Sequence, residues 1–254
     1  MSDVATIARR YRDAINMLLD DLERAETDHV NAAAERIAAH IAEDRLVYVY
    51  GPGGHSNLAA QEVFFRAGGL MHVSAILDDG TLLSNGALRS MAMERTPGYG
   101  VVVIDDWGLG SNDLLILVNA YGINAALIDA ALEAKRRGTT TIGISSVQHA
   151  SSTAPEHPAR HPTKQNLHDL VDYVIDSHVP VGDAVLDIAG VSERVGAIST
   201  FANAYLLNWL MATATERLAK RGVSVPVWRS GNAPGGDEAN ATALGRFRGR
   251  VRRL

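Results

Sequence analysis

Apolar residues recur every three or four positions along the first part of the chain. Between residues 4 and 42 they fall on one face of a helix, and the pattern restarts near Asp28, a residue type that commonly begins a helix. The sequence therefore predicts two N-terminal helices, the second capped by Asp28. Their apolar faces would form part of a core or a dimer contact.

The period then changes to short, continuous apolar runs separated by helical stretches. The runs span residues 46–50, 71–77, 101–104, 114–118, 139–144 and 171–175. Helical patterns cover residues 57–67, 124–137, 199–221 and the tail from Asp237 onward. Continuous apolar strands that alternate with helices are typical of a parallel sheet covered on both faces. We therefore expect an α/β fold, a three-layer, doubly wound parallel sheet. Residues 1–42 would be N-terminal helices, and residues 43–254 the main domain with a tail that lines the site.

Small polar residues gather where three of the expected strands give way to helices. These junctions are residues 51–56 (GPGGHS), 119–124 (NAYGIN) and 145–152 (SSVQHASS). Glycine lets the backbone approach a ligand closely, and a helix N-terminus offers free N–H groups. The first junction lacks the G-x-G-x-x-G and Walker patterns. Three junctions at one sheet edge favour a site for a small polar molecule.

Composition narrows the classes of function. The chain has 254 residues, no cysteine and a formal charge of −5. A negative chain is not built around nucleic acid, and the lack of cysteine excludes thiol nucleophiles and cysteine-ligated metals. No apolar run is long enough to span a membrane and no secretory leader is visible, so we expect a cytoplasmic protein. The five arginines of residues 246–254 are interpreted as a solvated tail, or one that docks on an acidic partner subunit.

The order of these motifs resembles the sugar isomerase (SIS) domain family. The resemblance rests on residues 50–56 with 61–70, on the stretch from Leu114 to Ser146, and on the C-terminal pieces 182–183, 199–200 and 230–237. The C-terminal pieces are similar to a bacterial branch described as phosphosugar-binding and related to phosphoheptose isomerases. The resemblance covers about residues 40–250. It implies a five-stranded parallel sheet, a homodimer or homotetramer with a site shared between subunits, and a sugar or sugar phosphate as ligand.

Two loops depart from the family pattern. The second loop of the family reads S-N-S-G-x-N, whereas here the serine positions are Asn119 and Tyr121, and Ile123 stands at an often basic position. Near residue 160, Lys164 and Gln165 replace the glycine and lysine of the branch. Hydrogen bonds to a charged group contribute about 1.5–3 kcal/mol each, so the loss of two hydroxyls would weaken phosphate binding. We therefore hypothesise a substrate that differs from the usual phosphosugar.

Aldose–ketose isomerisation through an enediol needs a base and an acid. Glu62 follows the first loop and precedes Phe64, so an apolar setting would raise its pKa toward that of a useful base; the alternative is a surface ion pair with Arg66. His55 and His149 are the candidate acids because they lie in or beside the first and third loops. No metal-binding spacing of histidines is present, so we expect no metal and no cofactor.

The sequence thus favours an SIS enzyme that isomerises a sugar phosphate or modified sugar. A non-catalytic phosphosugar sensor, or a sugar lyase or etherase of the same fold, remains the alternative. Nucleic acid and membrane are not expected as partners. The candidate substrate-binding residues come from all the loops named above: Gly53, Gly54, Ser56, Asn119, Tyr121, Asn124, Ser145, Ser146, His161, Ser199, Thr200, Ser230 and Asn232.

Overall fold

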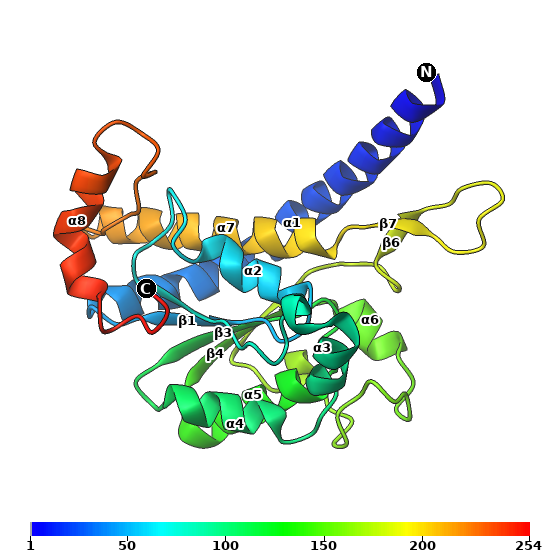
Figure 1. Cartoon of the computed structure of the whole chain (residues 1–254), viewed down its shortest axis with the longest axis horizontal. Coiled ribbons are helices and arrows are strands. Elements are labelled where there is room, and N and C mark those ends of the chain that lie inside the picture. Colours follow the sequence, from blue (N-terminus) through cyan, green and yellow to red (C-terminus); the bar gives the residue numbers. More distant parts are fainter. Residues whose placement is uncertain (1) are drawn as a thin grey trace.

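A five-stranded parallel sheet forms the centre of the molecule (Figure 1). The computed structural model describes residues 2–254, with side chains from residue 6 onward. The strand order is β2-β1-β3-β4-β5. The bounds are β1 Val47–Tyr50, β2 Val73–Ile76, β3 Leu114–Val118, β4 Thr140–Ser145 and β5 Tyr173–Asp176. The expected doubly wound α/β fold is confirmed.

Helices cover both faces of the sheet. On one face lie α1 (Ser2–Ala42), α2 (Ser56–Val63) and α7 (Ser199–Lys220), and on the other α4 (Tyr99–Trp107) and α5 (Ala125–Arg137). Alternate residues of each strand supply the two cores. In β3, Leu114 and Ile116 face the α1 side, whereas Leu115 and Leu117 face the α5 side. The remaining short elements are η1 (Leu83–Asn85), α3 (Ala87–Glu94), α6 (Val147–Ser152) and η2 (Leu167–Asp169).

The two expected N-terminal helices are one continuous helix. Helix α1 runs through Asp28 without a break, so Asp28 caps nothing and lies exposed in the helix interior. The apolar residues of its C-terminal half, from Val30 to Ile41, belong to the same core as the sheet. Packing on one continuous face therefore outweighs the local capping signal.

Residues 101–104, interpreted from sequence as a strand, lie in helix α4 instead. Only Val103 and Ile104 of this run are buried, while Val101 and Val102 are exposed. Gly100 explains how closely α4 approaches α5, because a Cβ there would lie 2.0 Å from the carbonyl oxygen of Ala126. Helix packing thus overrides the β-propensity of three consecutive valines.

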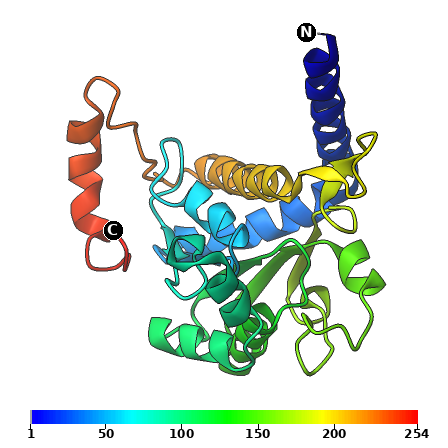
Figure 2. The same cartoon turned by 45° about the vertical axis from the view of Figure 1, so that its right-hand side comes forward.

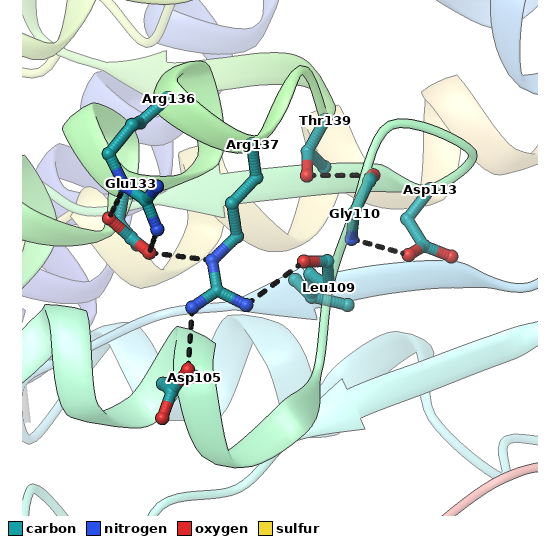
Figure 3. Close-up of polar contacts among 8 residues, drawn as sticks. All are labelled: Asp105, Leu109, Gly110, Asp113, Glu133, Arg136, Arg137 and Thr139. Atoms are coloured by element: carbon teal, nitrogen blue, oxygen red, sulfur yellow. Dashed lines mark hydrogen bonds and ion pairs between the residues drawn. The ribbon is translucent and has the colours of Figure 1, made fainter.

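An ionic network joins the end of α5 to α4 (Figure 3). The buried carboxylate of Glu133 accepts hydrogen bonds from Arg136 and from Arg137 Nε. Arg137 also donates to Asp105 Oδ1 at 2.6 Å and to the carbonyl of Leu109 at 3.3 Å. The arginine pair lowers the pKa of Glu133 to about 2. The network holds together α4 and α5, the two helices that form the core on the second face of the sheet.

A short antiparallel hairpin, absent from the sequence-based expectation, follows the sheet. It consists of β6 (Ala184–Leu186) and β7 (Val195–Ala197) and lies beside the projecting N-terminal half of α1 (Figure 2). The Tyr11 hydroxyl donates to the carbonyl of Ala197, and Arg10 donates to that of Asp187 at 2.7 Å. The hairpin matters for the site because Asp183 lies directly before β6.

The C-terminal arm docks on its own chain. Helix α8 (Gly236–Phe247) ends in Phe247, which is fully buried and packs edge-on against His72. Arg246 and Arg250 both pair with Asp44. The expectation of a solvated tail is therefore wrong, and docking on a partner subunit stays a prediction. The arginines meet acidic groups of the same chain, including Asp106, which Arg252 contacts at 2.7 Å.

Along residues 2–254, no helix combines the length and the apolar character that a membrane span requires.

Candidate functional site

A polar cavity lies at the carboxyl ends of β1 and β3, where the direction of winding changes in the sheet. Ligands of open α/β sheets bind at this position. The cavity encloses about 160 Å³. It is lined by the loop after β1, the loop after β3, the end of α3, the residue before β6 and the start of α7: Gly53, Gly54, His55, Ser56, Asn119, Ala120, Tyr121, Glu94, Asp183 and Ser199.

The glycine loop after β1 is shaped to receive side chains from the segment that follows β2. Gly53 has a φ of +104°, and a Cβ there would lie 2.7 Å from the carboxyl carbon of Glu94. A Cβ on Gly54 would lie 2.4 Å from Leu83 Cδ2. The buried Asn57 side chain donates to the carbonyls of Gly53 and Thr81, which ties the loop to that segment. The glycines therefore allow Glu94 and Leu83 to close over the loop.

Glu94 is a carboxyl group in the cavity lining with a strongly raised pKa. Burial raises the pKa of Glu94 to about 7 from an ordinary 4.5, and the hydrogen bond from Asn119 opposes the rise. Asn119 Nδ2 lies 3.3 Å from Glu94 Oε1 and 3.1 Å from Ser56 Oγ. A carboxyl group poised near neutral pH can take up and return a proton.

Asn119 also sets the shape of the second loop. Its Oδ1 accepts the backbone N–H groups of Tyr121 at 2.9 Å and Gly122 at 3.1 Å. The ring of Tyr121 stacks on His149 with centroids 3.7 Å apart and an angle of 17°. Burial lowers the pKa of His149 and raises that of Tyr121, so both rings are neutral at pH 7. Together they form a rigid, uncharged wall.

Asp183 holds the start of α7 at the opposite side of the cavity. Its backbone has a φ of +67°. Oδ1 accepts the N–H groups of Ile198 at 3.0 Å and Ser199 at 2.7 Å, and Oδ2 accepts the Ser199 hydroxyl at 2.6 Å. The carboxylate therefore occupies the position at which a helix N-terminus would attract an anion.

Seven residues expected at the site from sequence line this cavity: Gly53, Gly54, His55, Ser56, Asn119, Tyr121 and Ser199. Others support it from behind. Ser145 Oγ lies next to Gly122, and Ser146 caps α6 by accepting the N–H of His149 at 3.1 Å. His149 is not part of the cavity lining, and its ring stacks on that of Tyr121, which is.

The structure does not bring Glu62 to the cavity. Its carboxylate lies in a separate hollow between α2 and α7, where it pairs with Arg66 Nε at 3.0 Å and accepts from Asn208 Nδ2 at 3.2 Å. The ion pair with Arg66 that the alternative interpretation expected is present, but Arg66 lies beyond the end of α2, so it is not a pair on the helix surface. Helix α2 ends at Val63, because Phe64 turns extended and Phe65 has a φ of +49°.

Five further candidates lie outside the cavity lining. Asn124 is the N-cap residue of α5 and donates to the carbonyl of Ala159 at 3.3 Å. His161 is buried against Asp129, with Nε2 and Oδ1 3.0 Å apart. Thr200 is exposed next to Ser199. Ser230 and Asn232 belong to the turn before α8. This turn comes shortly after Trp228, which packs with Leu46 and Met71 in a small core at the amino edge of the sheet.

Sequence reasoning missed Glu94, and it noted Asp183 only as part of a family resemblance. Glu94 lies in residues 78–100, a stretch without a clean apolar period. The signal available in the sequence was the pair Gly53 and Gly54, since glycine permits a close approach that Glu94 uses in the structure. Among the described residues, no group of three histidine or carboxylate side chains is arranged to hold a metal ion.

Comparison with known proteins identifies the class. The sequence profile of the SIS domain matches residues 10–146. Because this match covers more than half of the chain, the protein belongs to the SIS domain family. Its similarity to curated proteins is of full length. It is 34% identical to UPF0309 protein BH0227 of Halalkalibacterium halodurans, over 95% of this chain and 94% of that protein. It is 35% identical to a UPF0309 protein of Brucella anthropi, over 96% and 97% of the two chains.

Solved structures share the fold at low sequence identity. Phosphoheptose isomerase GmhA from Neisseria gonorrhoeae aligns with a TM-score of 0.58 at 13% identity, over 84% of this chain and 99% of that one. A phosphoheptose isomerase from Francisella tularensis aligns with a TM-score of 0.55 at 14% identity, over 85% and 100%. E. coli CFT073 c3406, solved in complex with A5P, aligns with a TM-score of 0.50 at 13% identity, over 88% and 94%.

Proposed function

We propose that the protein is an aldose–ketose sugar isomerase whose proton-transferring group is Glu94. The observation that carries the proposal is the Glu94 carboxyl group itself, which lies against Gly53 in the cavity and has a pKa of about 7. A base works best when its pKa lies near the working pH, because it is then both ionised and able to hold a proton. The phosphoheptose isomerases that share the fold carry an isomerase activity in their names.

The reaction moves one carbon-bound proton between neighbouring carbons. The ionised Glu94 takes the proton from C2 of the open-chain aldose, and the C2–H electron pair forms the C1–C2 double bond of the enediol. The carbonyl oxygen on C1 gains a proton from His55 or from water. Glu94 then returns its proton to C1 while the hydroxyl on C2 gives its proton to the group that protonated the C1 oxygen. The product is the isomeric ketose, and both protein groups regain their starting protonation states. His55 lines the same cavity as Glu94.

Neighbouring groups support this role for Glu94. The Asn119 amide nitrogen donates to the Glu94 carboxyl group, and its oxygen accepts the backbone N–H of Tyr121 in the second loop. The Ser56 hydroxyl lies within hydrogen-bonding distance of the same amide, at 3.1 Å. These contacts would fix the carboxylate relative to a bound sugar, which is the positioning that proton transfer requires.

The test compares two glutamates that the structure separates. Glu94→Gln removes the proton acceptor and keeps the shape and the hydrogen bond from Asn119. We expect isomerisation, measured as solvent deuterium incorporated into the sugar, to fall by about a thousandfold, with binding changed less than about threefold. Glu62→Gln, the matched control on α2, should retain activity because Glu62 pairs with Arg66 outside the cavity. Free sugars and their phosphate esters are both supplied.

Three outcomes speak against the proposal. Binding with no turnover by the wild type would make the protein a sensor. A product that has lost a substituent, visible by mass, would make it a lyase or etherase. Activity lost in Glu62→Gln and kept in Glu94→Gln would identify Glu62 on α2 as the base.

We also propose that the protein acts in the cytoplasm as a homodimer or homotetramer. Leu58 and Phe201 lie in the first turns of the two packed helices α2 and α7, and are 44% and 46% exposed. Exposed apolar side chains on packed helices favour association. Light scattering of the purified protein measures the number of subunits, and a monomer at all concentrations would contradict this.

A further inference from the structure

We infer that His161 is a positioning residue for Glu94 and that it acts through Asp129. The inference rests on the proposed function, which gives Glu94 its role as the proton-transferring group. His161 lies outside the cavity lining, so it does not touch a sugar bound there. Its influence passes through the buried Asp129 to the backbone of Gly98, which follows Glu94 in the same segment.

The segment that carries Glu94 is held by polar contacts on either side of it. Helix α3 buries Ser90 and leaves its other side chains partly or fully exposed, so apolar packing fixes it only weakly. Ser90 Oγ donates to the carbonyl of Thr81 at 2.7 Å. Beyond Glu94, the N–H of Gly98 donates to Asp129 Oδ2 at 2.6 Å. The second contact is therefore the anchor on the far side of Glu94.

His161 holds Asp129 in the orientation that this anchor needs. Both side chains are buried, and Nε2 of His161 lies 3.0 Å from Asp129 Oδ1. The other ring nitrogen, Nδ1, accepts the backbone N–H of Thr163 at 3.1 Å. Because a backbone N–H only donates, the ring proton lies on Nε2, which then donates to Asp129. The loop around residue 161 thus selects the tautomer that binds Asp129.

The carboxylate of Asp129 needs a donor for each of its oxygens because it is buried. Gly98 supplies one donor and His161 the other. Gly98 is also the N-cap residue of α4, a favourable position for a negative side chain. Without the ring, Asp129 would turn toward another donor or toward water and release Gly98. The end of α3 could then move away from the glycine loop.

Such a movement would have two measurable effects on Glu94. Proton transfer depends on the position of the carboxyl group, so the rate falls more than the affinity. Burial is what raises the pKa of Glu94, so a looser segment lowers that pKa. Arg95 on the same segment, and His55 and Asp183 in the lining, are the other charged or titratable groups beside Glu94, and the test leaves them in place.

The experiment compares His161→Asn with His161→Gln in the full-length protein. The glutamine amide reaches as far as Nε2 and can donate to Asp129, whereas the asparagine amide matches Nδ1 and stops short of it. We expect kcat for isomerisation to fall by about tenfold or more in His161→Asn, with KM changed less than about threefold. His161→Gln should recover most of the loss.

A second measurement reads the position of Glu94 without any turnover. NMR of the protein labelled with ¹³C-glutamate, assigned with Glu94→Gln, gives the pKa of Glu94. This pKa should stay near 7 in the wild type and in His161→Gln, and fall by about one unit in His161→Asn. The control is His157→Asn, since His157 is exposed in the same loop and should change neither kcat nor the pKa of Glu94.

Three results overturn the inference. One is an unchanged kcat and an unchanged pKa of Glu94 in His161→Asn. Another is a loss that His161→Gln or His157→Asn shares in full. The third needs no variant and so remains available if a substituted protein does not fold: ¹⁵N NMR of the wild type that finds the ring proton of His161 on Nδ1.

The two proposals fail separately. A lowered pKa of Glu94 in His161→Asn, in a protein that turns over no sugar, keeps the positioning role and removes the isomerase. Turnover that depends on Glu94 and is the same in His161→Asn keeps the isomerase and removes the role of His161.

Discussion

Replacing Glu94 with glutamine should make the protein more stable at neutral and alkaline pH. In the folded chain the pKa of Glu94 is about 7, against an ordinary 4.5, and burial is the main cause. The folded state therefore binds this proton more tightly than the unfolded state. Wild-type stability falls as the pH rises from about 4.5 to about 7, and then levels off. A glutamine side chain carries no titrating proton, so the variant lacks this pH-dependent loss.

The size of the effect follows from the difference between the two pKa values. At about 1.4 kcal/mol per pH unit the ceiling is about 3 kcal/mol, and residual exposure of the carboxyl group reduces it to about 2 kcal/mol. For a chain of this length that corresponds to a melting temperature about 4–8 °C higher for Glu94→Gln at pH 8. Near pH 4.5 and below, the two proteins should be equally stable.

Urea unfolding of the wild type, Glu94→Gln and Glu62→Gln at pH 5 and pH 8 measures this, at one protein concentration. A gain in stability on losing a carboxylate is the signature of a site that holds a group in an unfavourable state for function. The reasoning is refuted if Glu94→Gln is no more stable than the wild type at pH 8, or if its gain is the same at both pH values.

Three further outcomes are expected from other contacts. Glu133→Gln should lower the free energy of unfolding by about 1 kcal/mol at pH 7, after allowance for the exposed arginines. Because the pKa of Glu133 is lowered to about 2, this loss of stability should fade as the pH falls from 4.5 toward 2, which urea titrations measure. Phe247→Ala removes a fully buried ring and should cost about 3 kcal/mol, with faster proteolysis before α8, whereas equal cleavage rates would contradict tight docking. The Glu26 carboxylate, 2.8 Å from His178, raises the pKa of that histidine; His178→Gln should therefore be more destabilising at pH 5.5 than at pH 9, and a pH-independent loss would argue against the ion pair.

The local pattern of apolar residues predicted the strands of the sheet but not the segments at the surface. The run at residues 114–118 became β3 with the same bounds, and α5 begins after Asn124 and stops at Gly138, as the capping signals predict. Each of these elements has one strong local signal: a continuous buried run for β3, and a pair of capping residues for α5. Residues 101–104 carry the same apolar signal, yet they form a helix because Gly100 lets α4 settle against α5, a contact between distant parts of the chain.

The site divides in the same way. The loops after β1 and β3 could be placed from sequence because parallel strands bring their carboxyl ends to one edge. Glu94 could not be placed from sequence, since its position next to Gly53 depends on the path that η1 and α3 take after β2. Glu62 and Glu94 are equally acidic in sequence, and only the path of the chain decides which one faces the cavity.

The docking of the C-terminal arm has a consequence for how the protein is made. Arg246 contacts Asp44 across 202 residues, and Phe247 closes the small core around Leu46 and Met71. During synthesis the sheet can assemble while this edge stays open, because its cover leaves the ribosome after all five strands. Contacts between such distant residues form slowly, since a long loop must close first. A nascent chain would therefore expose the amino ends of β1 and β2 to chaperones or to other chains until α8 and the residues after it have been released.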